Sequence, residues 1–203
     1  MPEPLGYVDF DDMGIADEEV LVRVPATEME KVRRGQYVKI ESKSPDKKKY
    51  LGRIISGPLF VPDAVDKNSA FARASILNAA TISFRPDFHA VCGAEILSGI
   101  DSEMHRTGAF GRPQPQSPVY SLDSNNIQQL IGIEGDMYLG QLTGYQDVKM
   151  LFPAHKNAGL PRNVGIFGTV GSGKTNTSQV LIEEASKNGW SVIVLSLLQE
   201  GFQ

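Results

Sequence analysis

Residues 168–175 read Gly-Thr-Val-Gly-Ser-Gly-Lys-Thr, and this octet restricts the possible folds of the chain more than any other feature. It matches the pattern G-x-x-x-x-G-K-[ST]. The short apolar run 163–167 precedes it, residues 174–187 show apolar positions at helical spacing, and a second apolar run follows at 191–195. A strand, a glycine-rich loop, a helix and a further strand in this order predict a βαβ unit with two buried parallel strands.

The residue types of the octet point to phosphate chemistry. Gly168, Gly171 and Gly173 lack a Cβ atom, so their amides can approach an anion closely, and successive N–H groups at a helix start can surround phosphate oxygens. Lys174 supplies a flexible positive charge for the β- and γ-phosphates, and the hydroxyl of Thr175 suits Mg²⁺. The alternative, a glycine-rich turn that binds nothing, needs no Lys-Thr pair.

We therefore predict a site for ATP with Mg²⁺, in which Lys174 is the catalytic residue and Thr175 is the magnesium ligand. The predicted nucleotide-binding residues are Gly168, Thr169, Val170, Gly171, Ser172, Gly173, Lys174, Thr175 and Asn176.

Composition limits the class of protein. The 203 residues are 41% hydrophobic and 22% charged, which is ordinary for a globular protein of one large or two small domains. The net charge of −4 gives no global attraction to nucleic acid or to an anionic membrane. A single cysteine excludes an intrachain disulfide, and the sequence shows neither a secretory signal nor a long apolar run. These features predict a cytoplasmic protein without a membrane partner.

The region before the octet is rich in short strand-like runs. In residues 20–24 the three valines share one face, and in residues 36–41 Val38 and Ile40 oppose the polar positions. Turn residues recur between such runs, as in a small barrel or sandwich. We expect a mixed fold, with an all-β barrel domain at 1–156 and the first βαβ unit of an incomplete RecA-like P-loop α/β domain at 157–203. Further strands are predicted at 5–10, 49–55, 71–84 (which could be partly helical), 90–97, 137–142 and 148–152, a short helix at 125–131, and an exposed loop at 101–117.

Several strings in this order resemble one family. Arg-Gly-Gln-Tyr-Val at 34–38, Leu-Gly-Arg-Ile at 51–54 and Tyr-Leu-Gly-Gln-Leu at 138–142 precede Gly-Ser-Gly-Lys-Thr-Asn at 171–176. Together they are similar to the HerA-type ATPases of the HerA/FtsK group. The resemblance implies an N-terminal HAS barrel, related in form to the ATP synthase barrel, followed by a RecA-like motor domain.

The resemblance also implies a function. Proteins of this family are ring-forming hydrolases, typically hexameric, that bind ATP between subunits and move double-stranded DNA as translocases or helicases. They commonly act with a NurA-type nuclease in DNA end resection, or in defence against phage. The chain is therefore expected to be the ATP-binding portion of such a translocase. The alternative is a non-catalytic module in which nucleotide binding regulates oligomerisation. A GTPase is less favoured, because no guanine-reading Asn-Lys-x-Asp string occurs.

The sequence departs from the family pattern after the second apolar run. The family usually continues with a segment similar to Asp-x-x-Gly-Glu-Tyr. Here Glu200 matches the Glu, but Ser196, Gln199 and Gly201 replace the Asp, the Gly and the Tyr. A Walker B aspartate, a catalytic glutamate and an arginine finger are not found in the sequence. Because phosphoryl transfer needs these positioned groups, we expect an N-terminal portion of a longer protein, and negligible ATP hydrolysis by these 203 residues alone.

Other conspicuous residues have simpler interpretations. The lysine run 47–49 could contact DNA phosphates, but a solvated turn explains it as well. Cys92 lies in an apolar run and is interpreted as a buried thiol. Glu183 and Glu184 are interpreted as surface residues of the predicted helix. The three histidines lack metal-ligand spacing.

Overall fold

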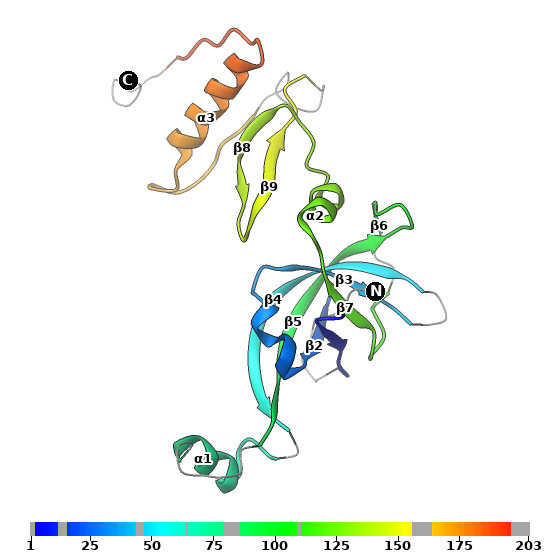
Figure 1. Cartoon of the computed structure of the whole chain (residues 1–203). Coiled ribbons are helices and arrows are strands. Elements are labelled where there is room, and N and C mark those ends of the chain that lie inside the picture. The colour runs from blue at the N-terminus through cyan, green and yellow to red at the C-terminus, as the bar shows by residue number, and fades with distance from the viewer. Residues whose placement is uncertain are drawn as a thin grey trace. The chain divides into compact units, whose positions relative to one another are not determined.

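The computed structural model of the chain describes residues 3–11, 16–43, 47–63, 65–78, 86–108, 111–155 and 164–195. It contains two compact units, Met1–Leu130 and Ile131–Gln203, which are considered separately here. Figure 1 shows the strands of the first unit and the hairpin and helix of the second.

The first unit is built on a closed antiparallel barrel. Its described strands pair in the order β2-β1-β7-β3-β4-β5, and a further pairing of β2 with β5 closes the ring. Closure leaves none of these six strands as an open edge. The β-barrel expected from the sequence is thus confirmed. The strands are β1 (Gly6–Val8), β2 (Glu19–Val24), β3 (Tyr37–Glu41), β4 (Lys49–Pro62), β5 (Phe88–Ile100) and β7 (Pro118–Ser121), and the short β6 (Arg106–Thr107) pairs with the end of β5.

Alternation along the strands fills the barrel. Val20, Val22 and Val24 of β2 are each 1% exposed, and Val38 and Ile40 of β3 are completely buried. These are the faces that the two-residue period predicts, because successive side chains of a strand point to opposite sides. The barrel core therefore follows directly from the sequence pattern.

Two strands continue beyond the barrel as an arm. The pairing of β4 with β5 extends from Leu59 opposite Val91 to Pro62 opposite Phe88, and the connection between them carries helix α1 (Ala70–Leu77). Figure 1 shows α1 at the end of this arm. We call the part of β4 from Leu59, helix α1 and the paired part of β5 the arm.

Helix α1 corrects part of the sequence prediction. A strand was predicted over 71–84, with partial helix as the alternative, and the described residues 71–77 are helical. The local reason is a cap: the Ser69 hydroxyl accepts a hydrogen bond from the Ala72 amide at 3.0 Å, and the helix that follows is rich in alanine. Residues 79–84 of the predicted strand lie outside the described residues.

Smaller elements complete the first unit. Helix α2 (Ser124–Ile131) confirms the predicted short helix, with Ile127 and Leu130 buried. The 3₁₀ helix η1 (Ala26–Lys31) and strand β7 were not predicted, because a single turn and a four-residue strand are too short to show a period. None of the described helices is both long enough and apolar enough to cross a membrane.

The second unit joins a hairpin to a helix. Strands β8 (Met137–Leu142) and β9 (Tyr145–Phe152) form an antiparallel pair, and helix α3 (Lys174–Lys187) has the predicted limits. Met137, Ala154 and Ala185 are buried between them. The hairpin therefore belongs to the second compact unit, because it packs on α3. The limits predicted for the domains, 1–156 and 157–203, stay a prediction.

The two buried strands expected on either side of α3 are not found. Over the described residues of 163–167 and 191–195 the chain forms no strand pairing, and Phe167, Ile193 and Leu195 are 93%, 86% and 91% exposed. A strand needs a neighbour to satisfy its backbone groups, and no described residue supplies one here. Residue 163 lies outside the described residues, and so does segment 196–203, which differs from the family pattern. The RecA-like domain therefore stays a prediction.

Candidate nucleotide-binding site

The glycine-rich loop forms a tight turn that ends at the start of α3. Gly171 and Gly173 have φ angles of +79° and +83°, in the left-handed region that favours glycine, and Gly173 is the N-terminal cap of α3. The Ser172 amide donates to the Thr169 carbonyl at 3.2 Å, which closes the turn. A Cβ atom at Gly168 would overlap the Ser172 hydroxyl. The predicted glycines are thus the residues that this loop conformation requires.

Lys174 folds back over the loop. Its Nζ atom donates to the Thr169 carbonyl oxygen at 2.5 Å, although Lys174 itself is the first residue of α3. Thr175 and Asn176 are exposed on the first helical turn, and Val170 is completely exposed at the turn of the loop. The structure therefore brings the lysine charge and the Thr175 hydroxyl to one open surface at the helix start.

Helix α3 adds a favourable electrostatic field. Its free amides point toward the loop, and the first turn, all of which is described, contains no acidic residue. The Thr177 amide donates to the Gly173 carbonyl at 2.9 Å, so regular helical bonding begins at the cap. A helix N-terminus attracts an anion through these free N–H groups and through its dipole. The first turn of α3 therefore holds no carboxylate that would compete with a phosphate chain.

Glu184, which the sequence analysis interprets as a surface residue, connects the C-terminal part of α3 to the hairpin. The Glu184 carboxylate accepts a hydrogen bond from the Tyr138 amide at 2.8 Å and one from Lys187 Nζ at 2.6 Å. The Glu184 side chain is only 13% exposed, so that interpretation was wrong. The i,i+3 spacing to Lys187 was visible in the sequence, but the contact with β8 depends on the tertiary packing.

The Glu184 contacts predict a pH-dependent stability. The hydrogen bond from Lys187, and then that from the Tyr138 amide, lower the pKa of Glu184 below its ordinary value. A lowered pKa in the folded state stabilises the unit above the ordinary pKa of 4.5, and this contribution is lost as the pH falls through the lower folded-state value. We expect Glu184→Gln to be less stable than the wild type at pH 7 and equal to it at low pH.

Tryptophan fluorescence can measure this difference. Trp190 is the only tryptophan in the sequence, and it packs on the cluster formed by the hairpin and α3. Denaturant midpoints of wild type and Glu184→Gln should therefore converge as the pH falls from 7 to values well below 4.5. Glu183→Gln is the matched control, because Glu183 is exposed. A constant difference between wild type and Glu184→Gln across this range would contradict the assignment.

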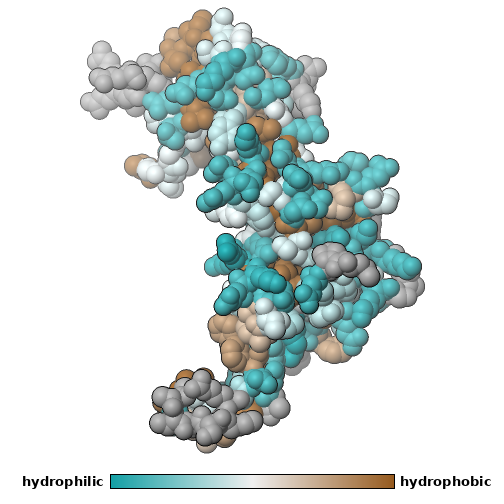
Figure 2. Space-filling model, viewed as in Figure 1, coloured by the Kyte–Doolittle hydropathy of each residue, from teal (hydrophilic) through white to brown (hydrophobic). Residues whose placement is uncertain are grey.

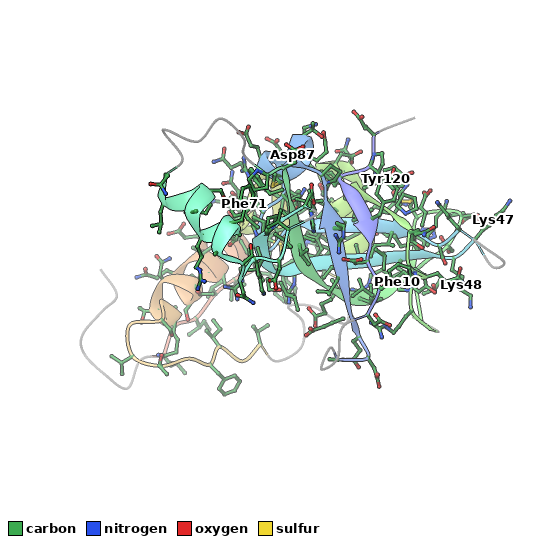
Figure 3. All side chains as sticks on the ribbon, turned by 90° about the horizontal axis from the view of Figure 1, so that it is seen from below. Phe10, Lys47, Lys48, Phe71, Asp87 and Tyr120 are labelled. Carbon is green, nitrogen blue, oxygen red and sulfur yellow. The ribbon has the colours of Figure 1, made fainter. Side chains whose placement is uncertain are left out.

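Lys47, Lys48, Cys92 and His89, which the sequence analysis also considered, lie in the first unit. Lys47 and Lys48 project from the turn between β3 and β4, which supports the interpretation as a solvated turn (Figure 3). Cys92 is buried in the barrel, and burial raises the pKa of its thiol. His89 contacts the Asp63 carboxylate through Nδ1, a pairing that the sequence did not predict.

The fold and the loop define a class: a β-barrel followed by a P-loop type segment. Comparison with known proteins agrees. Residues 137–196 match the sequence model of the helicase HerA central domain. A probable helicase of Methanocaldococcus jannaschii is 31% identical over 85 residues, which are 42% of this chain and 16% of that protein, so the match spans a small part of that relative. The resemblance to HerA-type ATPases is thereby confirmed, with the family match confined to residues 137–196.

The matched range agrees with the structural units. It begins at the first residue of β8 and contains α3 and the whole glycine-rich loop. The hairpin and α3 are therefore one region in sequence comparison as well as in packing. Both matches are to proteins described as helicases.

Proposed function

We propose that the chain is the ATP- and Mg²⁺-binding portion of a HerA-like DNA translocase or helicase. One observation supports this most strongly. Inside the family match, two left-handed glycines and Lys174 lie together at the start of a helix that has no acidic residue in its first turn. This combination suits the phosphates of a nucleotide.

The residues of the loop take distinct roles in this proposal. The amides of the loop up to Thr175 hold the phosphate oxygens, and the helix dipole favours their charge. Lys174 exchanges its hydrogen bond to the Thr169 carbonyl for one to a phosphate. Thr175 turns its exposed hydroxyl to Mg²⁺, which, when bound with ATP, neutralises phosphate charge. Lys174 is the residue proposed to act in catalysis.

The wider activity is proposed on the family resemblance. It includes a hexameric ring, movement of double-stranded DNA, a role in end resection or phage defence, a NurA-type nuclease partner and a cytoplasmic location. Because the net charge is −4, contacts with DNA require local positive surface rather than the average field of the chain. Phosphoryl transfer requires further groups beyond the loop.

The magnesium role of Thr175 can be tested separately from phosphate binding. Thr175→Ala should bind ATP in EDTA as well as the wild type does, and should lose most of the gain in affinity that the wild type shows with Mg²⁺. We expect this loss to be about tenfold, the value of one charge-assisted contact. Thr177→Ala is the control, because the Thr177 hydroxyl instead donates to the Gly173 carbonyl at 3.1 Å. Titration calorimetry measures both affinities. An unchanged magnesium gain in Thr175→Ala would contradict the proposal.

A further inference from the structure

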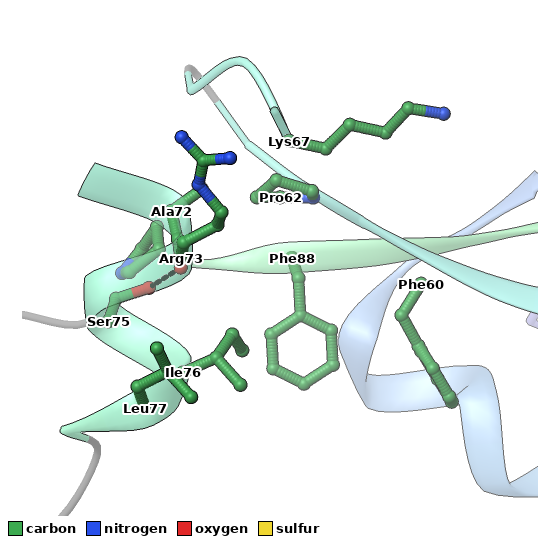
Figure 4. A pocket seen from close by; sticks show the side chains of 10 residues that line it. Phe60, Pro62, Lys67, Ala72, Arg73, Ser75, Ile76, Leu77 and Phe88 are labelled. Carbon is green, nitrogen blue, oxygen red and sulfur yellow. Dashed lines mark hydrogen bonds between the residues drawn. The ribbon is translucent and has the colours of Figure 1, made fainter. Parts of the chain in front are cut away.

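The arm holds an apolar cavity of about 740 Å³, far in sequence from the glycine-rich loop. Its walls come from β4, β5 and α1, as Figure 4 shows. The rings of Phe60 and Phe88 form one wall and meet edge to face, with 5.9 Å between their centroids. Ile76 and Leu77 of α1 form the opposite wall (Figure 4). The cavity volume lies in the range of specific binding pockets.

The apolar surface at the cavity is larger than a stable fold needs to expose. Among the lining residues, Leu77 is 83% exposed, Ile76 is 78% exposed, Phe60 is 63% exposed and Phe88 is 47% exposed. Figure 2 shows apolar surface along the arm. Scattered apolar residues are normal on a protein surface, whereas a contiguous patch of this kind marks an interaction site. The arm therefore fits a partner better than it fits solvent.

The charges at the rim indicate what the partner carries. Lys67 and Arg73 line the cavity, and no acidic residue does so among the described lining residues. Within the described part of the chain, neither side chain has a carboxylate partner. Figure 4 shows both cationic groups extending from the rim, above the apolar wall. A ligand with an apolar face and flanking carboxylates would complement both features.

A symmetric contact between two copies would not complement them. A two-fold axis would place the same surface on each side, and so would bring Lys67 and Arg73 close to the same two cations of the other copy. Repulsion of this kind costs affinity, whereas carboxylates on a different chain would gain it. We propose that the cavity of the arm binds an amphipathic, acidic helix of a partner protein. This proposal does not rest on the nucleotide site.

A charge-swap experiment tests the proposal on the full chain. The probes are two fluorescein-labelled 18-residue helical peptides with identical leucines at i, i+3, i+4 and i+7, flanked either by Glu or by Lys. The wild type should bind the Glu peptide about tenfold more tightly than the Lys peptide in an anisotropy titration. The double variant Lys67→Glu, Arg73→Glu should reverse this preference, and Ile76→Asp should weaken the binding of both peptides about tenfold.

A matched variant separates the rim from the overall charge. Lys43→Glu with Lys149→Glu changes the net charge by the same amount, and both residues are exposed and do not line the cavity. This control should keep the preference of the wild type for the Glu peptide. No binding of the Glu peptide by the wild type, an equal affinity for both peptides, or a preference that the double variant leaves unchanged would overturn the proposal. Light scattering that showed an oligomer lost in Ile76→Asp would also overturn it, in favour of a second copy.

Discussion

Lys174→Ala is expected to reduce ATP affinity about 100-fold. The Lys174 ammonium lies over the loop and is 2.5 Å from the Thr169 carbonyl, so it can move to a phosphate without a change in the backbone. A hydrogen bond from a charged group to phosphate contributes about 3 kcal/mol at the upper end of its range, which corresponds to about 100-fold in affinity. Titration calorimetry with Mg²⁺·ATP measures this loss directly.

Two further variants test whether the loss of ATP affinity is specific to the Lys174 ammonium. Lys149→Ala removes an exposed lysine of β9 and should leave ATP affinity unchanged. Lys174→Arg keeps the charge but replaces a compact ammonium with a planar group, so it should retain only part of the affinity. If Lys174→Ala bound Mg²⁺·ATP as tightly as the wild type does, the loop would not be the nucleotide site.

Ile40→Ala is expected to destabilise the barrel by about 3 kcal/mol. Ile40 is completely buried in β3, between the neighbouring strands β7 and β4, and its loss leaves a cavity in the centre of the first unit. Truncation of a buried isoleucine to alanine costs about 2–5 kcal/mol, because transfer and cavity terms add. Urea unfolding followed by far-ultraviolet circular dichroism measures the change.

A graded substitution provides the control for the barrel. Ile40→Val removes one methylene group and should cost only about 1 kcal/mol. Because Val38 is buried on the same face, Val38→Ala should also be costly, whereas substitution of the half-buried Tyr37 should cost less. If the free energy of unfolding of Ile40→Ala lay within about 0.5 kcal/mol of the wild-type value, β3 would not line the barrel core.

The elements that the sequence predicted well have strong local signals. Residues 20–24 and 36–41 alternate with a clear period, and the structure has strands at Glu19–Val24 and Tyr37–Glu41 with the expected faces buried. Helix α3 has the limits that its apolar spacing predicts, and in the structure Gly173 caps its start while Asn188 and Gly189 follow its end. The loop conformation also follows locally, since Gly171 and Gly173 occupy positions that favour glycine.

The features that the sequence did not predict depend on partners distant along the chain. Glu184 holds β8 through a backbone amide, which has no side-chain signature. The arm depends on the pairing of β4 with β5 that continues past the barrel, which joins residues distant in sequence. The cap at Ser69 favours a helix in a segment whose composition is typical of a strand. The runs 164–167 and 191–195 have strand composition, but composition alone cannot supply the neighbouring strand that pairing needs.

Backbone amide shifts measured by nuclear magnetic resonance, with and without Mg²⁺·ATP, test the central claim most directly. The account predicts that the largest shifts occur at Gly171, Gly173, Lys174 and Thr175, whose amides lie at the loop and the start of α3. The shifts should disappear in Lys174→Ala at the same ATP concentration. Saturating Mg²⁺·ATP that left these four amides unmoved, or that shifted residues of the barrel or the arm instead, would contradict the account.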